Sequence, residues 1–485
     1  MSDRENLKTK TISGFFWKFG ERILSQFISF AVSIILARLL MPKEYGVIAI
    51  AMIFITISNV LATSGLGTSL IQKKNADNID FSTMFYSGII LSIFLYFILY
   101  TASPSIARLY NNDQISPVLR ALGIIIPISA INSIQQAAVS RKLDFKKFFY
   151  ATSVGSIVSG IIGVLLAYKG FGVWALVAQQ LSDNIINTLT LNKIIKWRPS
   201  LVFSYQRFKE LFGFGIKFMF TNLIGTFFAQ LKGLIIGAKY TESDLAYYNR
   251  GENFPGILSN NIANSINAVL FPALTKVQDD SDELKKIVRR SMRTSCFIMC
   301  PLLFLLTAVS KEIVQILLTD KWLLCVPFIQ IISISYIFKI FSITSIQSLN
   351  AIGRSDIPLK LEFIKKPIYL LLILSSMWIS PIAIAVANMV FDFIEVIINA
   401  FPNKKYIYYT YKEQFLDVAP NFLISAIIAF VVFLVGKIHI NIGLLLAIQV
   451  SLYLVLYIGY AYLTHSESYT YILNIAKDII VKKKN

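Results

Sequence analysis

The sequence predicts an all-α polytopic membrane protein with about 14 transmembrane helices. Its 485 residues are 55% hydrophobic and 15% charged, and the mean hydropathy is +0.64, which leaves too little polar surface for a soluble fold. Apolar runs of about 20 residues, each long enough to cross roughly 30 Å of hydrocarbon, recur along the chain. No long polar interval separates these runs, so the sequence predicts no sizeable soluble domain.

Charged residues and Pro and Gly residues bound the predicted spans. The spans cover residues 12–40, 45–71, 81–102, 115–139, 148–168, 171–191, 208–238, 246–272, 292–309, 324–350, 358–380, 381–401, 415–436 and 440–463. The first apolar run is too long for the core of a signal peptide and contains Lys18, Glu21 and Arg22. We therefore expect it to be the first membrane helix.

The net charge of +19 is explained by a membrane rather than by nucleic acid. Lys and Arg residues concentrate in alternate breaks between spans, for example at 141–147, 193–209 and 276–293, whereas the opposite breaks hold few. Basic residues stay on the cytoplasmic side and contact anionic headgroups. We expect membrane lipids and no nucleic acid as partners, an even number of spans, and both termini in the cytoplasm.

An internal repeat divides the chain. Phe19-Gly20 and Ala37-Arg38 recur about 200 residues later as Phe214-Gly215 and Ala238-Lys239, again flanking a long apolar run. Six spans per copy give both copies the same orientation, as in parallel repeats related by an axis along the membrane normal. The predicted domains are residues 1–200 and 201–402, two pseudo-symmetric six-helix lobes around a central cavity, and residues 403–485, a final helix pair with a basic cytoplasmic tail.

Small residues and cysteines in the apolar segments have structural interpretations. Gly155, Ser159 and Gly163 stand four residues apart, so they share one face of the fifth span and suit close helix contact. The three cysteines are an odd number in or near apolar segments, which predicts buried thiols with no disulfide framework and no metal site: Cys296, Cys300 and Cys325.

Charged residues inside the spans indicate a polar interior. Residues 246–272 are long enough to cross a bilayer, yet they contain Arg250, Glu252 and several asparagines. A charge at bilayer depth costs several kcal/mol and therefore turns towards a polar cavity. The candidate cavity-lining cations are Arg22, Arg250, Lys339, Lys217, Lys18 and Lys232. The alternative is that Lys18 and Lys217 reach the inner headgroups and that Arg22 and Arg250 only pair with Glu21 or Glu252.

Acidic residues inside the spans form a second candidate set. Asp183 lies near mid-depth in the sixth span, and Asp392 and Glu395 lie three residues apart on one face of the twelfth. Carboxylates in such places hold Na⁺ or a proton and couple an ion gradient to transport. The alternative is that they form salt bridges or bind water. The ion is left open, and we expect no other cofactor.

Several short motifs carry a family resemblance along nearly the whole chain. They are GLGTSLIQK at 65–73, RKLDFK at 141–146, GFGVWALV at 170–177, WRP at 197–199, YYNRGE at 247–252, LFPAL at 270–274, AIGRSD at 351–356 and LEFIKKP at 361–367. In this order, and at these places relative to the predicted helices, they resemble Wzx-type polysaccharide flippases. The branch is that of the colanic and teichuronic acid exporters (WzxC-like) in the multidrug/oligosaccharidyl-lipid/polysaccharide (MOP) superfamily.

The resemblance implies a transport task. A flippase of this kind moves undecaprenyl-diphosphate-linked oligosaccharide, the repeat unit of a surface polysaccharide, across the bacterial cytoplasmic membrane by alternating access. It implies two lobes that rock around a central cavity, a groove for the lipid tail at the last two helices, and glycan polymerase or assembly proteins as further partners. A diphosphate requires fixed cations shielded from lipid, which the candidate cations would supply.

Three rival functions belong to other classes. A cation-coupled multidrug antiporter of the same superfamily would favour acids over cations in its cavity. A scaffold for glycan-assembly enzymes would transport nothing. The sequence does not favour an enzyme, because its only histidines are His439 and His465 and it has no phosphate-binding loop and no metal-spaced cluster. No catalytic residue is therefore proposed.

Overall fold

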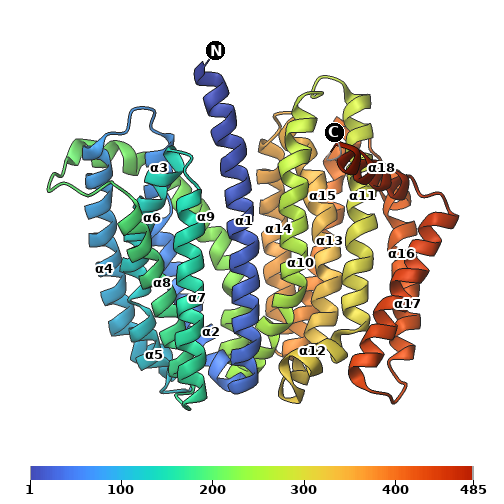
Figure 1. Cartoon of the computed structure of the whole chain (residues 1–485), viewed down its shortest axis with the longest axis horizontal. Helices are drawn as coiled ribbons and strands as arrows, with labels where there is room; N and C mark the ends of the chain where they lie inside the picture. The colour runs from blue at the N-terminus through green and yellow to red at the C-terminus, as the bar shows by residue number, and fades with distance from the viewer. Residues whose placement is uncertain (1, 483–485) are drawn as a thin grey trace. The chain divides into compact units, whose positions relative to one another are not determined.

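A computed structural model describes residues 2–482, and this part of the chain contains helices and no β-strand. Eleven of the described helical segments are long and apolar enough to cross a membrane. The end of the predicted basic tail, residues 483–485, lies outside the described residues. The predicted class of all-α polytopic membrane protein is confirmed (Figure 1).

The helices follow one another with short connections. In chain order they are α1 (Ser2–Leu39), α2 (Pro42–Thr63), α3 (Leu66–Gln72), α4 (Asn78–Leu109), α5 (Ile115–Leu122), α6 (Ile125–Arg141), α7 (Lys146–Tyr168), α8 (Val173–Ile194), α9 (Tyr205–Lys239), α10 (Glu242–Thr275), α11 (Ser281–Ala308), α12 (Ser310–Leu318), the 3₁₀ helix η1 (Asp320–Cys325), α13 (Val326–Ala351), α14 (Asp356–Ser376), α15 (Pro381–Tyr406), α16 (Tyr411–Val435), α17 (Ile442–Leu463) and α18 (Glu467–Lys482).

Three predicted spans form long helices but are not apolar enough to count among the eleven. They are α8, α10 and α14, with 22, 34 and 21 residues. All three carry intramembrane charges or amides, including Asp183 on α8 and Arg250 on α10. Polar groups that face other helices lower the mean hydropathy without preventing a helix from crossing. The number of about 14 spans stays a prediction.

The chain forms two compact units, Met1–Ala246 and Tyr247–Asn485, called unit 1 and unit 2 here. In unit 1, α7 packs between α1 and α8, and α2 contacts α9. In unit 2, α13 packs against α11 and α15, and α11 also contacts α16. The boundary between the units falls inside α10, whereas the predicted domains meet at residues 200 and 402; that division stays a prediction.

Glycine interrupts the second predicted span. The span is two helices, α2 and α3, and Gly65 between them has φ +92°. A Cβ at Gly65 would lie 2.2 Å from the carbonyl oxygen of Gly215 on α9. Position 65 therefore requires glycine for two reasons: the positive φ and the close approach of the two backbones.

The small-residue face of α7 packs against α8, as predicted. A Cβ on Gly155 would lie 3.3 Å from the backbone oxygen of Asp183, and one on Gly163 would lie 2.7 Å from Gln179. Ser159, between these glycines, donates its hydroxyl to Asp183 Oδ1 at 3.3 Å. The small residues thus make room for polar side chains of the neighbouring helix.

Large apolar side chains cover the outside of the helices. On α4, Ile90, Ile93, Phe94 and Phe97 are each more than half exposed and share one face by their spacing of three and four residues. A soluble protein rarely exposes such a continuous apolar stripe, so this face suits lipid.

The three cysteines are buried and free, as predicted.

Candidate functional site

The predicted cavity cations of unit 1 lie on α1 and α9. Lys18 and Arg22 are exposed one turn apart on α1, and Lys18 forms an ion pair with Glu21 at 2.6 Å. On α9, Lys217 is exposed and Lys232 is half-buried. Lys18 therefore pairs with Glu21 on its own helix, a partner that the alternative interpretation gave to Arg22. The role of all four in a cavity stays a prediction.

The predicted cations of unit 2 differ in their surroundings. Arg250 on α10 is 7% exposed, and its guanidinium carbon lies 5.0 Å from the centre of the Trp322 ring, which is itself buried. Lys339 lies halfway along the 26 residues of α13 and is exposed, with its Nζ 5.1 Å from the Tyr336 ring. Stacking on an aromatic ring stabilises a cation away from water.

The predicted acid of unit 1 is held by the small-residue face of α7. Asp183 is half-buried on α8, where it accepts the Ser159 hydroxyl. Its neighbour Asn187 accepts a hydrogen bond from Asn132 on α6 at 3.3 Å. The α6–α7–α8 contact therefore contains a carboxylate with neutral donors.

The predicted acids of unit 2 have different partners. Asp392 on α15 accepts hydrogen bonds from the Ser335 hydroxyl on α13 and from Asn388 Nδ2, the latter at 2.9 Å. Glu395 instead accepts from Lys365 Nζ at 2.9 Å. Glu395 thus forms the salt bridge that the alternative interpretation expected, whereas the Ser335 and Asn388 groups that donate to Asp392 are neutral.

Sequence reasoning missed the burial of Lys365. The sequence analysis assigned this lysine no partner, but its side chain is 1% exposed on α14 and pairs with both Glu362 and Glu395. A buried ammonium requires such partners because its desolvation costs several kcal/mol. The spacing of three residues between Glu362 and Lys365 was a signal for a local pair, whereas the contact with α15 is purely tertiary.

The polar contacts continue along α15. Asn399 donates to the Ser342 hydroxyl at 2.5 Å, and the Ser348 hydroxyl donates to Asn403 at 2.9 Å. Within the described residues, Asn399 Oδ1 and Asn403 Nδ2 are buried without a hydrogen-bond partner. The α13–α15 contact is therefore a buried polar seam rather than an apolar helix interface.

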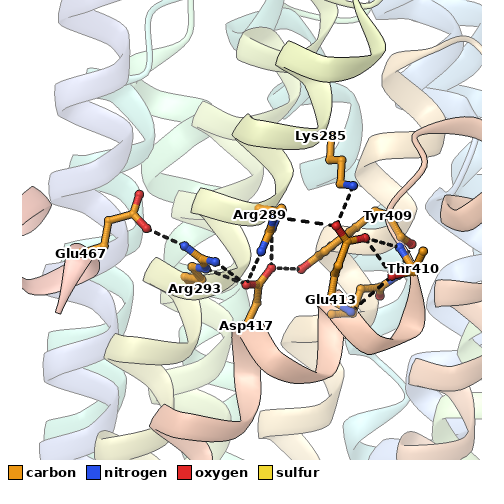
Figure 2. A network of polar contacts seen from close by, with 9 residues as sticks. Lys285, Arg289, Arg293, Tyr409, Thr410, Glu413, Asp417 and Glu467 are labelled. Carbon is orange, nitrogen blue, oxygen red and sulfur yellow. Dashed lines mark hydrogen bonds and ion pairs between the residues drawn. The ribbon is translucent and has the colours of Figure 1, made fainter. Parts of the chain in front are cut away.

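A ladder of ion pairs joins α11 to α16 and α18 (Figure 2). Asp417, whose side chain is 2% exposed, accepts two N–H bonds from Arg289 at 2.8 and 2.9 Å and one from Arg293 at 2.7 Å. Glu413 pairs with Lys285 at 2.8 Å, and Glu467 on α18 pairs with Arg293 at 2.5 Å. Burial, and then the Asp417 charge, raise the pKa of Tyr409, so its hydroxyl stays protonated and donates to Asp417.

Sequence reasoning also missed this ladder. It placed residues 276–293 in a basic break between spans, but α11 is one continuous helix from Ser281 to Ala308, and Leu284 and Val288 on it are fully buried. The signal was available in the spacing. Three basic residues stand four apart on α11 and two acids stand four apart on α16: Lys285, Arg289 and Arg293, and Glu413 and Asp417.

Unit 1 contains a similar arrangement. Asp80, fully buried at the start of α4, pairs with Lys73 at 3.1 Å and with Arg207 on α9 at 3.0 Å. Although partial burial lowers the pKa of Lys73, the hydrogen bonds and charges of Asp80 and Glu210 outweigh it and raise the pKa. Each unit thus has one buried aspartate held by two basic side chains.

Comparisons with known proteins show what the chain resembles. A family profile described as "Polysaccharide biosynthesis protein" matches residues 35–327. The succinoglycan biosynthesis transport protein ExoT of Rhizobium meliloti (strain 1021) is 22% identical over 308 residues, 64% of this chain and 62% of ExoT, so that match spans less than two thirds of ExoT. The lipopolysaccharide biosynthesis protein WzxC of Escherichia coli (strain K12) is 20% identical over 403 residues, 82% of this chain and 81% of WzxC.

The fold also matches a solved structure. The lipid II flippase MurJ, in an inward closed conformation, superposes with a TM-score of 0.74 at 16% sequence identity, covering 94% of this chain and 99% of that one. At this identity the match concerns the fold alone. The arrangement of the helices is that of a known membrane transporter.

Proposed function

Because the chain belongs to the polysaccharide biosynthesis protein family, we propose that it translocates a lipid-linked oligosaccharide across the membrane for the synthesis of a polysaccharide. Its similarity to ExoT and WzxC, a transport protein and a lipopolysaccharide biosynthesis protein, supports a role in export. The MurJ-like fold supports a flippase that works by alternating access. The proposed cargo is carried on undecaprenyl diphosphate.

Lys339 is the structural observation that carries the proposal. Its side chain is exposed halfway along α13, inside a segment apolar enough to span a membrane. An ammonium at that depth is far too costly against hydrocarbon, so it faces a water-filled path. A fixed cation there would attract a diphosphate and repel an organic cation, which favours the flippase over the multidrug antiporter.

The other predicted charges would serve the same path in different ways. We assign Arg22, Lys217 and Arg250 to contacts with the diphosphate, together with Lys18 and Lys232 near its two ends. Asp392 and Asp183, which accept hydrogen bonds from neutral side chains, are the proposed sites for Na⁺ or a proton, while Glu395 serves as the counterion of Lys365. Neutral donors leave the charge of a carboxylate available to a cation, whereas a salt bridge already neutralises it.

The proposed location is the bacterial cytoplasmic membrane, with both termini in the cytoplasm. The support is the concentration of basic residues in alternate breaks between spans. In this orientation the ion ladder of α11 and α16 lies at the cytoplasmic end of its helices. Glycan polymerase or other assembly proteins are the proposed partners on the membrane.

Transfer between leaflets tests the proposal directly. Purified protein is reconstituted in vesicles with a fluorescently labelled, diphosphate-linked oligosaccharide, and an impermeant quencher reports how much label reaches the outer leaflet. We expect transfer by the wild type, and a loss of about 10-fold or more with Lys339→Gln because one charge-assisted contact is worth about 1.5–3 kcal/mol. The matched control Lys311→Gln changes an exposed lysine on α12, outside the predicted spans, and should leave transfer unchanged. Wild-type vesicles that transfer no label would refute the proposed function.

A further inference from the structure

A pocket of about 410 Å³ lies at one end of unit 1, where three connections meet. It is lined by residues at the start of α2, at the start of α5 and in the α7–α8 turn, among them Lys43, Gln114 and Trp174. These connections follow the first, third and fifth predicted spans, so in the proposed orientation all three lie on the outer side. Ligand pockets commonly hold about 300–1,000 Å³, and this volume suits a single sugar better than a whole repeat unit.

The pocket presents exposed aromatic rings. Phe171 is 53% exposed and Trp174 is 43% exposed, and Met41 beside them is 57% exposed. Flat rings that remain accessible at the wall of a pocket offer a surface on which the apolar face of a sugar ring packs.

The same pocket presents free hydrogen-bonding groups of every kind. Lys43 and Gln114 are exposed, and neither side chain has an ion pair or hydrogen bond within the part of the chain that the structure describes. Glu44 Oε2 accepts the Met41 N–H at 2.7 Å, which leaves Oε1 without a hydrogen bond to any described residue. Sugar hydroxyls both donate and accept, so they match an ammonium, an amide and a carboxylate together.

The geometry of the α7–α8 turn holds this arrangement in place. Gly172 has φ +55°, and a Cβ at this position would lie 2.5 Å from Glu44 Oε1. Any other residue would displace either the turn or the carboxylate. Glu44 thus remains in the pocket, where its charge offsets that of Lys43 and disfavours a phosphate.

We propose that this pocket binds a neutral sugar ring of the oligosaccharide on the outer side of the membrane. The inference rests on the proposed function, because it names where the sugar portion binds after transfer. It adds a site away from the candidate cations, which serve the diphosphate. The rings of Phe171 and Trp174 would hold the sugar face, and Lys43, Glu44 and Gln114 its hydroxyls.

Sugar binding can be measured without transport. Full-length protein in lipid nanodiscs is mixed with the methyl glycosides of glucose, galactose and N-acetylglucosamine, and saturation-transfer NMR reports contact. We expect transfer to at least one glycoside, with a fall of about five-fold or more in Trp174→Ala and in Gln114→Ala. Trp378→Ala is the matched control, because Trp378 is 73% exposed beyond the end of α14 and outside the pocket.

Several outcomes would overturn the assignment. They are no transfer to any neutral glycoside, equal signals from the wild type and both pocket variants, or an equal loss in Trp378→Ala. Stronger binding of glucose 1-phosphate than of methyl glucoside would replace the neutral sugar with an anion. The vesicle assay is independent: failed leaflet transfer with intact sugar binding refutes the proposed function, and the reverse result refutes the pocket.

Discussion

Removing the charge of Asp417 should loosen unit 2. Asp417→Asn keeps the size of the side chain but removes the charge that Arg289 and Arg293 share, and it leaves one oxygen for the N–H groups and the Tyr409 hydroxyl. Breaking a fully buried ion pair costs about 3–5 kcal/mol. The two arginines are 32% and 34% exposed and so partly solvated. We therefore expect a loss of about 2–3 kcal/mol, less than that cost.

Thermal unfolding provides the assay. A thiol-reactive fluorophore reports exposure of the buried cysteines, and Cys296 lies one turn beyond Arg293 on α11. A loss of 2–3 kcal/mol should lower the melting midpoint by about 4–12 °C for a unit of this size. Glu467→Gln is the control, since Glu467 is 62% exposed and an exposed pair is worth under about 1 kcal/mol. Equal melting of Asp417→Asn and Glu467→Gln would refute the claim that the ladder is a buried clamp.

Two further changes test other contacts. Lys365→Met should lower the free energy of unfolding by about 3–5 kcal/mol, because it leaves Glu395 without its cation. Lys366→Met, at a 36% exposed site, should lower it by less than about 1 kcal/mol. Equal melting midpoints of the two variants in the same thiol assay would contradict this. Gly65→Ala should lower the free energy of unfolding by at least about 2 kcal/mol, because the new Cβ would lie 2.2 Å from a backbone oxygen of α9. Gly225→Ala has open space around it and should leave the stability unchanged or raise it slightly. Thermal melts followed by circular dichroism check the second pair, and a stable Gly65→Ala protein would show that the backbones can move apart.

The fold class was predictable because a bilayer imposes a length on every span. Apolar runs of about 20 residues predict helices almost regardless of neighbouring structure. Because this argument uses only the length and hydropathy of each run, it misplaces some helix boundaries. Hydropathy does not show that Gly65 divides the second span into α2 and α3, or that the basic segment before the ninth predicted span belongs to the same helix, α11.

The charged contacts were harder to predict because sequence position does not distinguish a solvated lysine from a paired one. Lys365 is the tenth of the 21 residues of α14, and its place in the sequence does not show whether it reaches a headgroup or a partner helix. It is buried because Glu395 comes from α15, 30 residues later. Spacing of four residues on α11 and α16 indicated two charged faces, but only the packing of the two helices shows that they meet.

Chemical access to residue 339 tests the central claim most directly. In a variant with Cys296, Cys300 and Cys325 replaced by alanine, Lys339→Cys in nanodiscs is treated with a membrane-impermeant, cationic thiol reagent. A watery path lined for a diphosphate predicts rapid modification that slows when lipid-linked oligosaccharide is added and is unaffected by the same lipid without diphosphate and sugar. A thiol that stays unmodified, or that reacts at the same rate with and without the oligosaccharide, would contradict the account.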